Sequence, residues 1–241
     1  MNPQNSDRPY IICHMVTSVD GKVTGDFLSD PQSAEATEIY YRINRERRAD
    51  GFVCGRVTME GSFTGGWYPD LSQYTPVSHK TDCIASDLSG FYAVAFDTHG
   101  KLGWASNKIV DPDGDPGYDG AEIIEVLSED VDARYLGYLQ EKGISYLFAG
   151  ESAIDVSLAL FKLKTLVGCD TLLLEGGSIL NGAFERADAV DELSLVVAPV
   201  IADKEAKPLF TDADTAQFVL TKCENEHGNL VLNYQRTSGE Q

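Results

Sequence analysis

The sequence has few basic residues. Its 241 residues include 38 acidic side chains against 19 basic ones, which gives a formal net charge of −19. A nucleic-acid-binding face needs Lys and Arg to displace counterions from phosphates, and an anionic membrane surface attracts basic segments in the same way. We therefore expect neither nucleic acid nor a membrane surface as a partner.

The sequence also lacks paired cysteines and long apolar runs. Its five cysteines are odd in number and form no CxxC pair, which predicts free, mostly buried thiols in a reducing compartment. Residues 1–8 are polar, unlike a signal peptide, and no run of about 18 apolar residues is available to cross a bilayer. We expect a cytoplasmic protein with no metal site.

The motifs of several enzyme classes are missing as well. The sequence contains no HExxH, no Walker GxxxxGK[ST], no GxSxG elbow and no zinc deaminase signature. It contains no GxGxxG fingerprint at its strand–helix junctions, so an ordinary Rossmann assignment is not supported. The four histidines lie far apart in the sequence, and we expect them to be structural or solvated: His14, His79, His99 and His227.

What is present is a regular alternation of apolar runs and helical patterns. We predict strands at 9–17, 51–55, 91–96, 123–127, 144–149, 171–174 and 192–198, and helices at 33–48, 131–142, 152–166 and 178–186. The runs 218–222 and 230–235 predict a closing antiparallel hairpin. Strands separated by helices predict an α/β fold with a mainly parallel central sheet flanked by helices. Without a repeat or a linker-like segment, we expect residues 1–241 to form a single domain, ordered from about 9 to 236.

The strongest candidate site follows the predicted strand 171–174. Glu175 ends this apolar strand, and Gly176, Gly177 and Ser178 lead directly into a helix. Glycines let a ligand approach the backbone, and the exposed N–H groups of a helix start favour phosphate. Desolvation would raise the pKa of Glu175, as is common for functional carboxylates. The equally weighted alternative is a tight turn in which Glu175 bonds to neighbouring backbone.

A second candidate lies at the end of the predicted strand 51–55. There Gly55 is followed by Arg56, which can donate two N–H groups to a phosphate, and by Thr58, which adds a hydroxyl group. The alternative is that Arg56 is a surface residue paired with Glu60.

A third candidate is the loop Ser18-Val-Asp-Gly-Lys22, which leaves the first strand. Lys22 could hold an anionic or carbonyl-bearing substrate, with Asp20 orienting it. Ser18 and Asp20 are therefore candidate substrate contacts. The alternative is an ordinary Asp-Gly-Lys turn with solvated charges.

Together these residues resemble the reductase domain of the bifunctional riboflavin-biosynthesis deaminase–reductase, a member of the dihydrofolate reductase-like fold. The resemblance spans about residues 9 to 236, and no deaminase domain is expected in this chain. It rests on Ser18–Lys22, on Cys54-Gly-Arg-Val-Thr58 and on the long ordered stretch from Glu175 to Pro199.

The resemblance implies an NADPH-dependent reductase, similar to 5-amino-6-(5-phosphoribosylamino)uracil reductase, that transfers a hydride to a phosphorylated ribosylaminopyrimidine. It also implies a homodimer. Arg56 and Thr58, after Gly55, would hold the adenosine-side phosphates of NADPH, and the segment Gly176–Ser178 would hold the pyrophosphate. Lys22 matches the substrate-facing lysine of the motif, and Glu175 matches the carboxylate beside the reacting centre.

One departure from the pattern concerns the substrate. Residues 59–67 stand where such reductases usually carry an Asp-rich turn. Two alternatives therefore stay open. One is a reductase of dihydrofolate, another pterin or another small molecule, with Glu35 or Glu38 contacting a pterin. The other is a non-catalytic dinucleotide-binding protein.

Overall fold

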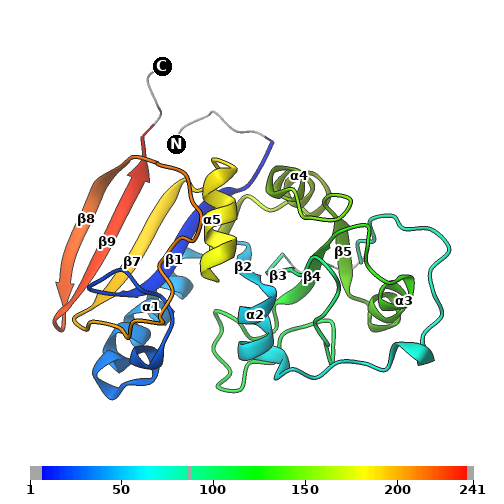
Figure 1. Ribbon diagram of the computed structural model, residues 1–241, viewed down its shortest axis with the longest axis horizontal. Helices are drawn as coiled ribbons and strands as arrows, with labels where there is room; N and C mark the ends of the chain where they lie inside the picture. The colour runs from blue at the N-terminus through cyan, green and yellow to red at the C-terminus, as the bar shows by residue number, and fades with distance from the viewer. Residues whose placement is uncertain (1–6, 86–87, 89, 238–241) are drawn as a thin grey trace. The chain divides into compact units, whose positions relative to one another are not determined.

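The computed structural model describes residues 7–85, 88 and 90–237, and it shows the alternating strands and helices of an α/β fold (Figure 1). The strands are β1 (Tyr10–Ser18), β2 (Gly51–Gly55), β3 (Tyr92–Phe96), β4 (Glu122–Leu127), β5 (Ser145–Phe148), β6 (Thr171–Leu174), β7 (Glu192–Ala198), β8 (Phe218–Glu226) and β9 (Asn229–Arg236). The helices are α1 (Ala34–Arg47), α2 (Arg56–Met59), α3 (Ala133–Lys142), α4 (Val156–Lys162) and α5 (Ser178–Arg186). Within the described residues, no helix is both long and apolar enough to cross a membrane.

The predicted capping groups of two helices are not the observed ones. The helix predicted at 152–166 begins at Val156, because the side chain of Asp155, not that of Ser152, accepts a hydrogen bond from the N–H of Leu158 at 3.0 Å. Ser33 occupies the N-cap position of α1 as predicted, but its side chain makes no capping hydrogen bond. The pattern therefore located both helices but not the group that caps them.

Residue contacts divide the chain into two compact units, which we describe one at a time. Unit 1 comprises Ala49–Leu172 with the chain up to Pro9, and unit 2 comprises Tyr10–Arg48 and Leu173–Gln241. Strand β6 contributes residues to both units. The expectation of a single domain stays a prediction.

Unit 1 contains parallel strands in the order β5-β4-β3-β2. Nearly all residues of these strands are buried, as their mainly apolar sequences predict for strands covered on both faces, and the buried residues include Glu122 and Glu125 of β4. Gly55 is in register with Phe96, and Phe96 with Val126, so the carboxyl ends of β2, β3 and β4 lie at one edge. This edge is where parallel sheets place their binding sites.

Unit 2 combines a parallel and an antiparallel part. Strand β1 pairs in parallel with β7, and β7, β9 and β8 then pair in antiparallel order, which includes the predicted C-terminal hairpin (Figure 1). One face of these strands packs against α1, where Val196 and Val231 form a buried core with Ile39 and Ile43. The mainly parallel α/β arrangement with a closing hairpin is thus as predicted.

Buried polar residues of this fold have structural roles. His14 is fully buried, its ring stacks on Tyr40 with centroids 4.4 Å apart, and Nδ1 lies 3.0 Å from the hydroxyl of Ser194. Burial lowers the pKa of His14 to about 4, so the imidazole is neutral at physiological pH. All five cysteines are free thiols, as predicted, and three of them are buried.

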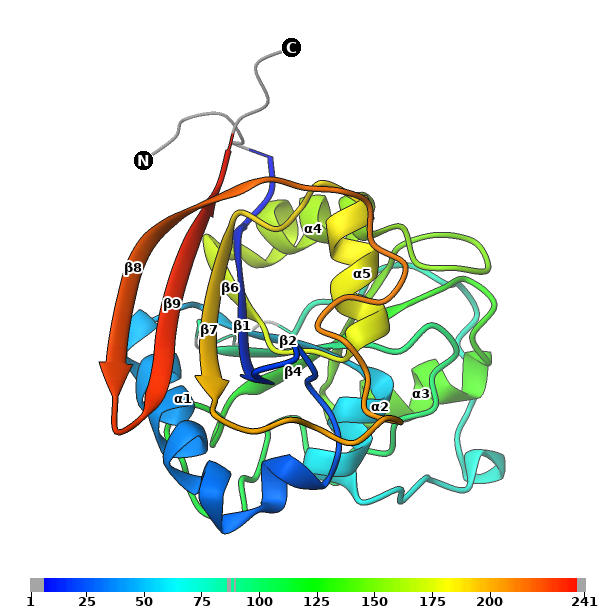
Figure 2. The ribbon, with the colours of Figure 1, turned by 60° about the vertical axis from the view of Figure 1, so that its left-hand side comes forward.

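Between β7 and β8 the chain passes beside α5 (Figure 2). Residues 207–211, named here the 207–211 segment, bond to two other parts of unit 2. The N–H of Val23 donates to the carbonyl of Lys207 at 2.9 Å, and the N–H of Leu209 donates to that of Gly21 at 3.1 Å. The N–H of Thr211 donates to the carbonyl of Ser178 at 3.0 Å.

The close approach of this segment to α5 depends on glycine at position 182. A Cβ atom there would overlap the carbonyl oxygen of Thr211, which is backbone and cannot rotate away. We predict that Gly182→Ala lowers the free energy of unfolding by about 1–3 kcal/mol, the usual cost of overpacking. Urea titration followed by circular dichroism measures the change.

The control is Gly61→Ala, because a Cβ atom at Gly61 has no neighbour within 4 Å. It should change the free energy of unfolding by less than about 0.5 kcal/mol. Equal effects of the two substitutions would contradict the importance of the contact between α5 and the 207–211 segment.

Candidate functional site

The predicted loop after β1 is a closed turn. The N–H of Ser18 donates to the carbonyl of Lys22, and the N–H of Lys22 donates to the hydroxyl of Ser18, both at 2.9 Å. The Ser18 hydroxyl donates to Oδ1 of Asp20 at 2.7 Å, and the N–H of Ala202 donates to the same oxygen at 3.0 Å. The bonds from Ala202 and Ser18 lower the pKa of Asp20. Asp20 thus fixes the loop that presents Lys22, whose side chain is partly exposed.

Glu175 directly follows β6 and is buried, with 6% of its surface exposed. The side-chain amide of Asn44 donates a hydrogen bond from Nδ2 to Oε1 of Glu175 at 2.7 Å. Asn44 lies on the buried side of α1 together with Ala36, Ile39 and Ile43. Sequence reasoning did not select Asn44, although a polar residue among the apolar positions of a helix was a readable signal.

The Gly-Gly-Ser junction begins α5 as predicted. Gly176 has a φ of +102°, and a Cβ atom there would lie 3.2 Å from Cε of Met15, so glycine is the residue that fits. The Gly176–Gly177 peptide bond is cis. The hydroxyl of Ser178 bonds to the carbonyl of Pro208 and to the hydroxyl of Thr211. The junction therefore offers an anion its backbone N–H groups, since the Ser178 hydroxyl already has partners.

The 207–211 segment connects these two predicted regions. Through Lys207 and Leu209 it bonds to the chain next to Lys22, and through Pro208 and Thr211 it bonds to the start of α5. The side chain of Asn181 adds a bond to the carbonyl of Leu209 at 2.9 Å. Lys22 and the Gly176–Ser178 junction, distant in sequence, are thus held by one stretch of backbone in unit 2.

Unit 1 carries the remaining predicted region, Gly55, Arg56 and Thr58. Gly55 ends β2 and precedes α2, and Arg56 forms an ion pair with Glu60 one helical turn later. The alternative interpretation of Arg56 is therefore present in the structure. Both side chains are more than one third exposed, and an exposed pair of this spacing contributes only about 0.3–0.5 kcal/mol. A phosphate group could displace Glu60 at little cost.

Asp97 lies at the same edge of unit 1 and was not selected from the sequence. It follows β3, is 1% exposed, and accepts hydrogen bonds from the N–H groups of Lys101 and Leu102. Burial raises the pKa of Asp97, while Arg56 acts in the opposite direction. The edge at which the parallel strands of unit 1 end thus carries a buried aspartate, Asp97, as well as the predicted Arg56.

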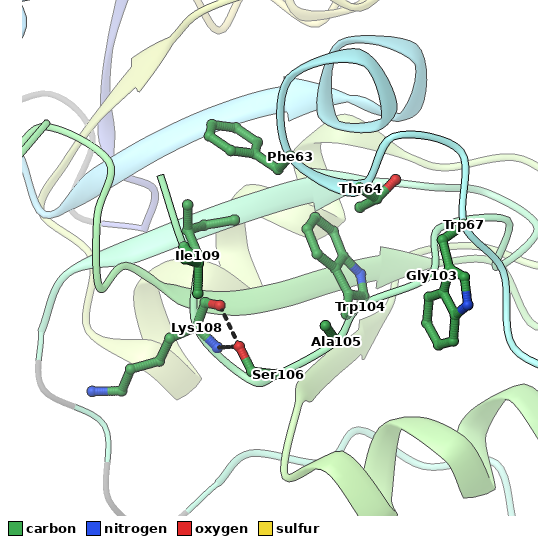
Figure 3. A pocket seen from close by; sticks show the side chains of 10 residues that line it. Phe63, Thr64, Trp67, Gly103, Trp104, Ala105, Ser106, Lys108 and Ile109 are labelled. Atoms are coloured by element: carbon green, nitrogen blue, oxygen red, sulfur yellow. Dashed lines mark hydrogen bonds between the residues drawn. The ribbon is translucent and has the colours of Figure 1, made fainter. Parts of the chain in front are cut away.

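Unit 1 also contains a cavity of about 130 Å³ that the sequence did not predict (Figure 3). Its apolar lining includes Phe63, Trp67, Trp104 and Ile109, and its polar lining includes Lys108. In Figure 3 the ammonium group of Lys108 points away from the two indole rings. The cavity is a small, aromatic-walled space without a charged group at its centre.

A buried carboxyl group supports the wall of this cavity. The indole N–H of Trp104 donates to Oε1 of Glu125, and the hydroxyl of Tyr135 donates to the same oxygen at 3.2 Å. Glu125 is fully buried, and its Oε2 has no hydrogen-bond partner among the described residues. Desolvation, reinforced by the charge of Asp97, raises the pKa of Glu125 well above its ordinary value.

Among the residues that the structure describes, no group of three or more His, Cys, Asp or Glu side chains could hold a metal ion.

Comparison with known proteins bears on these regions. Residues 117–232 match the RibD C-terminal domain family. Over 207 residues the chain is 25% identical to the 2,5-diamino-6-ribosylamino-4(3H)-pyrimidinone 5′-phosphate reductase of Aquifex aeolicus, covering 84% of this chain and 82% of that protein. The predicted resemblance to riboflavin-biosynthesis reductases is confirmed. The RibD-like segment includes Glu175–Ser178 and the 207–211 segment, whereas Lys22 and Arg56 lie outside it.

Solved structures show the same fold. RibD of Acinetobacter baumannii superposes with a TM-score of 0.65 at 18% identity, covering 96% of this chain and 58% of that one. A pyrimidine reductase-like protein of Corynebacterium diphtheriae superposes with a TM-score of 0.66 at 18% identity, covering 98% of this chain and 96% of that one. The chain therefore has a RibD-like fold and spans 58% of the length of the Acinetobacter protein.

The raised pKa of Glu125 leads to a prediction on stability. Because its pKa is higher in the folded than in the unfolded chain, Glu125 contributes most stability below its unfolded pKa of 4.5, and this is lost as pH rises towards the folded pKa. Relative to Glu125→Gln, the wild type should lose up to about 1.4 kcal/mol per pH unit in this window. Urea titrations from pH 4.5 upward measure the difference.

Glutamine keeps an oxygen that can accept from Trp104 and Tyr135 but cannot ionise. The free energies of unfolding of the wild type and of Glu125→Gln should therefore converge or cross as pH rises. Parallel curves over the whole range would show that Glu125 does not titrate differently in the folded state.

Proposed function

We propose that this protein is an NADPH-dependent reductase of a phosphorylated ribosylaminopyrimidine. The observation that carries the proposal is the 207–211 segment, which holds the Lys22 loop and the start of α5 together in unit 2. The name of the Aquifex relative describes the reduction of a ribosylaminopyrimidine 5′-phosphate, which supports this substrate class.

The Gly176–Ser178 junction suits a dinucleotide pyrophosphate. Gly176 adopts a positive φ, and glycine has no side chain of its own to cover its backbone. The first N–H groups of α5 then supply neutral donors and the positive end of the helix dipole. We assign the adenosine-side phosphates to Gly55, Arg56 and Thr58, with Arg56 exchanging Glu60 for phosphate. An arginine in this place supports NADPH over NADH.

NADPH supplies the hydride, and the protein must supply a proton to the atom next to the reduced carbon. Lys22, presented by the turn that Ser18 and Asp20 close, binds the substrate and can donate this proton. Glu175 is buried and hydrogen-bonded, so it is suited to hold or receive a proton beside the reacting centre. Ser18 and Asp20 stay candidate substrate contacts in addition to their role in the loop.

The geometry of α1 gives less support to a pterin substrate. Glu35 is exposed and lies 3.7 Å from His227, and Glu38 is exposed as well. Glu35 and Glu38, the carboxylates that would contact a pterin, thus face solvent. The buried polar residue of α1 is Asn44. The ribosylaminopyrimidine is the better supported substrate.

Free thiols throughout the chain support a reducing compartment such as the cytoplasm.

A homodimer is supported by one face of β7, β9 and β8. The register places Leu193 beside Tyr234 and Leu220, and Leu195 beside Leu232 and Cys223. This apolar face continues to Val197 and Leu230, and the charged side chain at its other end, Arg236, forms ion pairs with Glu185 and Asp188. The opposite face packs on α1. Because the chain carries a net charge of −19, two copies repel each other unless they meet through a mainly apolar surface such as this one.

For catalysis, we predict that Lys22→Ala lowers kcat by about 100-fold, the usual loss when a proton-transfer group is removed. NADPH affinity should stay nearly unchanged, because the pyrophosphate donors of α5 are intact. Stopped-flow oxidation of NADPH gives kcat, and cofactor fluorescence gives the dissociation constant.

The matched control is Lys204→Ala, which removes an exposed lysine that pairs only at 3.6 Å with its neighbour Glu205. Its kcat should equal that of the wild type. Each variant is assayed with the phosphorylated ribosylaminopyrimidine and with dihydrofolate, using NADPH or NADH. Binding of NADPH without oxidation on either substrate would support the non-catalytic alternative, and absence of binding would refute the proposal.

For assembly, we predict that the wild type elutes with twice the mass of one chain in size-exclusion chromatography with light scattering. Leu220→Lys should shift the protein towards the monomer, because Leu220 lies on the apolar face and is 48% exposed. Val219→Lys is the control, since Val219 is 55% exposed but points to the other face of the same strand. Equal behaviour of the two variants would place the dimer contact elsewhere.

A further inference from the structure

Asn44 is a buried polar residue without a role in the proposed chemistry so far. It is 6% exposed and shares the buried side of α1 with Ala36, Ile39 and Ile43. A buried amide costs stability unless its N–H groups find acceptors. Asn44 meets this requirement with Oε1 of Glu175, 131 residues away in the sequence.

The direction of this hydrogen bond is informative. Nδ2 of Asn44 can only donate, so the bond is strongest when the carboxyl group of Glu175 is ionised. A donor 2.7 Å from Oε1 also restricts the rotation of a side chain that projects from the end of β6. The amide therefore acts on both the charge and the orientation of Glu175.

Several ionisable groups on the surrounding elements have partners of their own. On α1, Arg47 pairs with Glu192, and Arg42 pairs with Glu46 and Glu226. On α5, Glu185 pairs with Arg236. On β1, His14 bonds to Ser194 and Tyr40, and the loop that follows carries Asp20 and Lys22. Asn44 thus supplies a neutral donor to Glu175 and not a charge.

We propose that Asn44 is a positioning residue for the reduction: its side-chain amide holds the Glu175 carboxylate in one orientation and in the ionised form. This inference rests on the proposed function, in which Glu175 handles the proton that accompanies hydride transfer. Asn44 itself touches neither substrate nor cofactor in this scheme.

The direct test is the titration of Glu175 in protein labelled with [13C]glutamate at the carboxyl carbon, with Glu175→Gln identifying the resonance. Asn44→Asp places two carboxyl groups at hydrogen-bond distance, and like charges there raise a pKa by about 1 unit or more. Asn44→Leu removes the donor and should raise the pKa of Glu175 as well. Ile43→Val, which shortens the neighbouring buried side chain on α1, should leave the titration unchanged.

The kinetic test follows the same logic. In both Asn44 variants the acidic limb of the kcat profile should move to higher pH by the shift seen in the titration, while the KM for NADPH stays close to wild type. A purely structural role of Asn44 would lower kcat at every pH without moving the limb. The inference is wrong if both variants titrate Glu175 at the wild-type pH.

The failure of the proposed function gives a different result. Full activity of Glu175→Gln would show that Glu175 does not take part in the reaction, and would therefore overturn the positioning role whatever the titration shows. Reduced activity of Glu175→Gln with an unshifted titration in both Asn44 variants would overturn the inference about Asn44 alone.

Discussion

The close contact between the 207–211 segment and the start of α5 is the constraint on which the proposed site in unit 2 depends. It consists of backbone hydrogen bonds on both sides of the segment and of a glycine at position 182 that leaves room for the carbonyl of Thr211. Backbone groups cannot change rotamer, so a site held by them is more rigid than one held by flexible side chains. The same segment accepts and shares the hydrogen bonds of the Ser178 hydroxyl, so the backbone amides at the start of α5 are the donors in the proposed site.

This arrangement explains how a strongly acidic chain could bind the proposed anionic cofactor. A net charge of −19 repels a dinucleotide at long range, but that repulsion is screened by salt over about 10 Å. Short-range donors decide the bound state. The predicted donors are the amides of α5, which carry no formal charge, and Arg56, whose charge is offset by Glu60 in the free protein. Moderate salt should therefore weaken binding less than it does in a basic cleft.

Element bounds and contacts that depend on neighbouring residues could be predicted from the sequence. Contacts between residues that are distant in the sequence could not. Strands β2, β6 and β7 and helix α5 have the predicted bounds, because apolar runs and flanking glycines specify them. The ion pair of Arg56 with Glu60 was foreseeable as an alternative, because residues four apart face each other on a helix. The bond from Asn44 to Glu175 spans 131 residues, and the 207–211 segment carries no repeated pattern, so neither follows from spacing. The cap of α4 was misplaced because Ser152 and Asp155 are both good capping residues.

Two buried glutamates show why position in a strand matters more than a shifted pKa. Glu125 lies inside β4, where desolvation raises the pKa of its carboxyl group, and its bonds to Trp104 and Tyr135 support a cavity wall. Glu175 lies just beyond β6, at the start of an amide-rich junction. A carboxyl group within a strand is enclosed by the sheet and its covering helices, whereas one at the carboxyl end stands where parallel sheets admit ligands. A raised pKa alone would have selected Glu125 as the candidate catalytic residue. The place of Glu175, directly after the carboxyl end of a parallel strand, selects Glu175 instead.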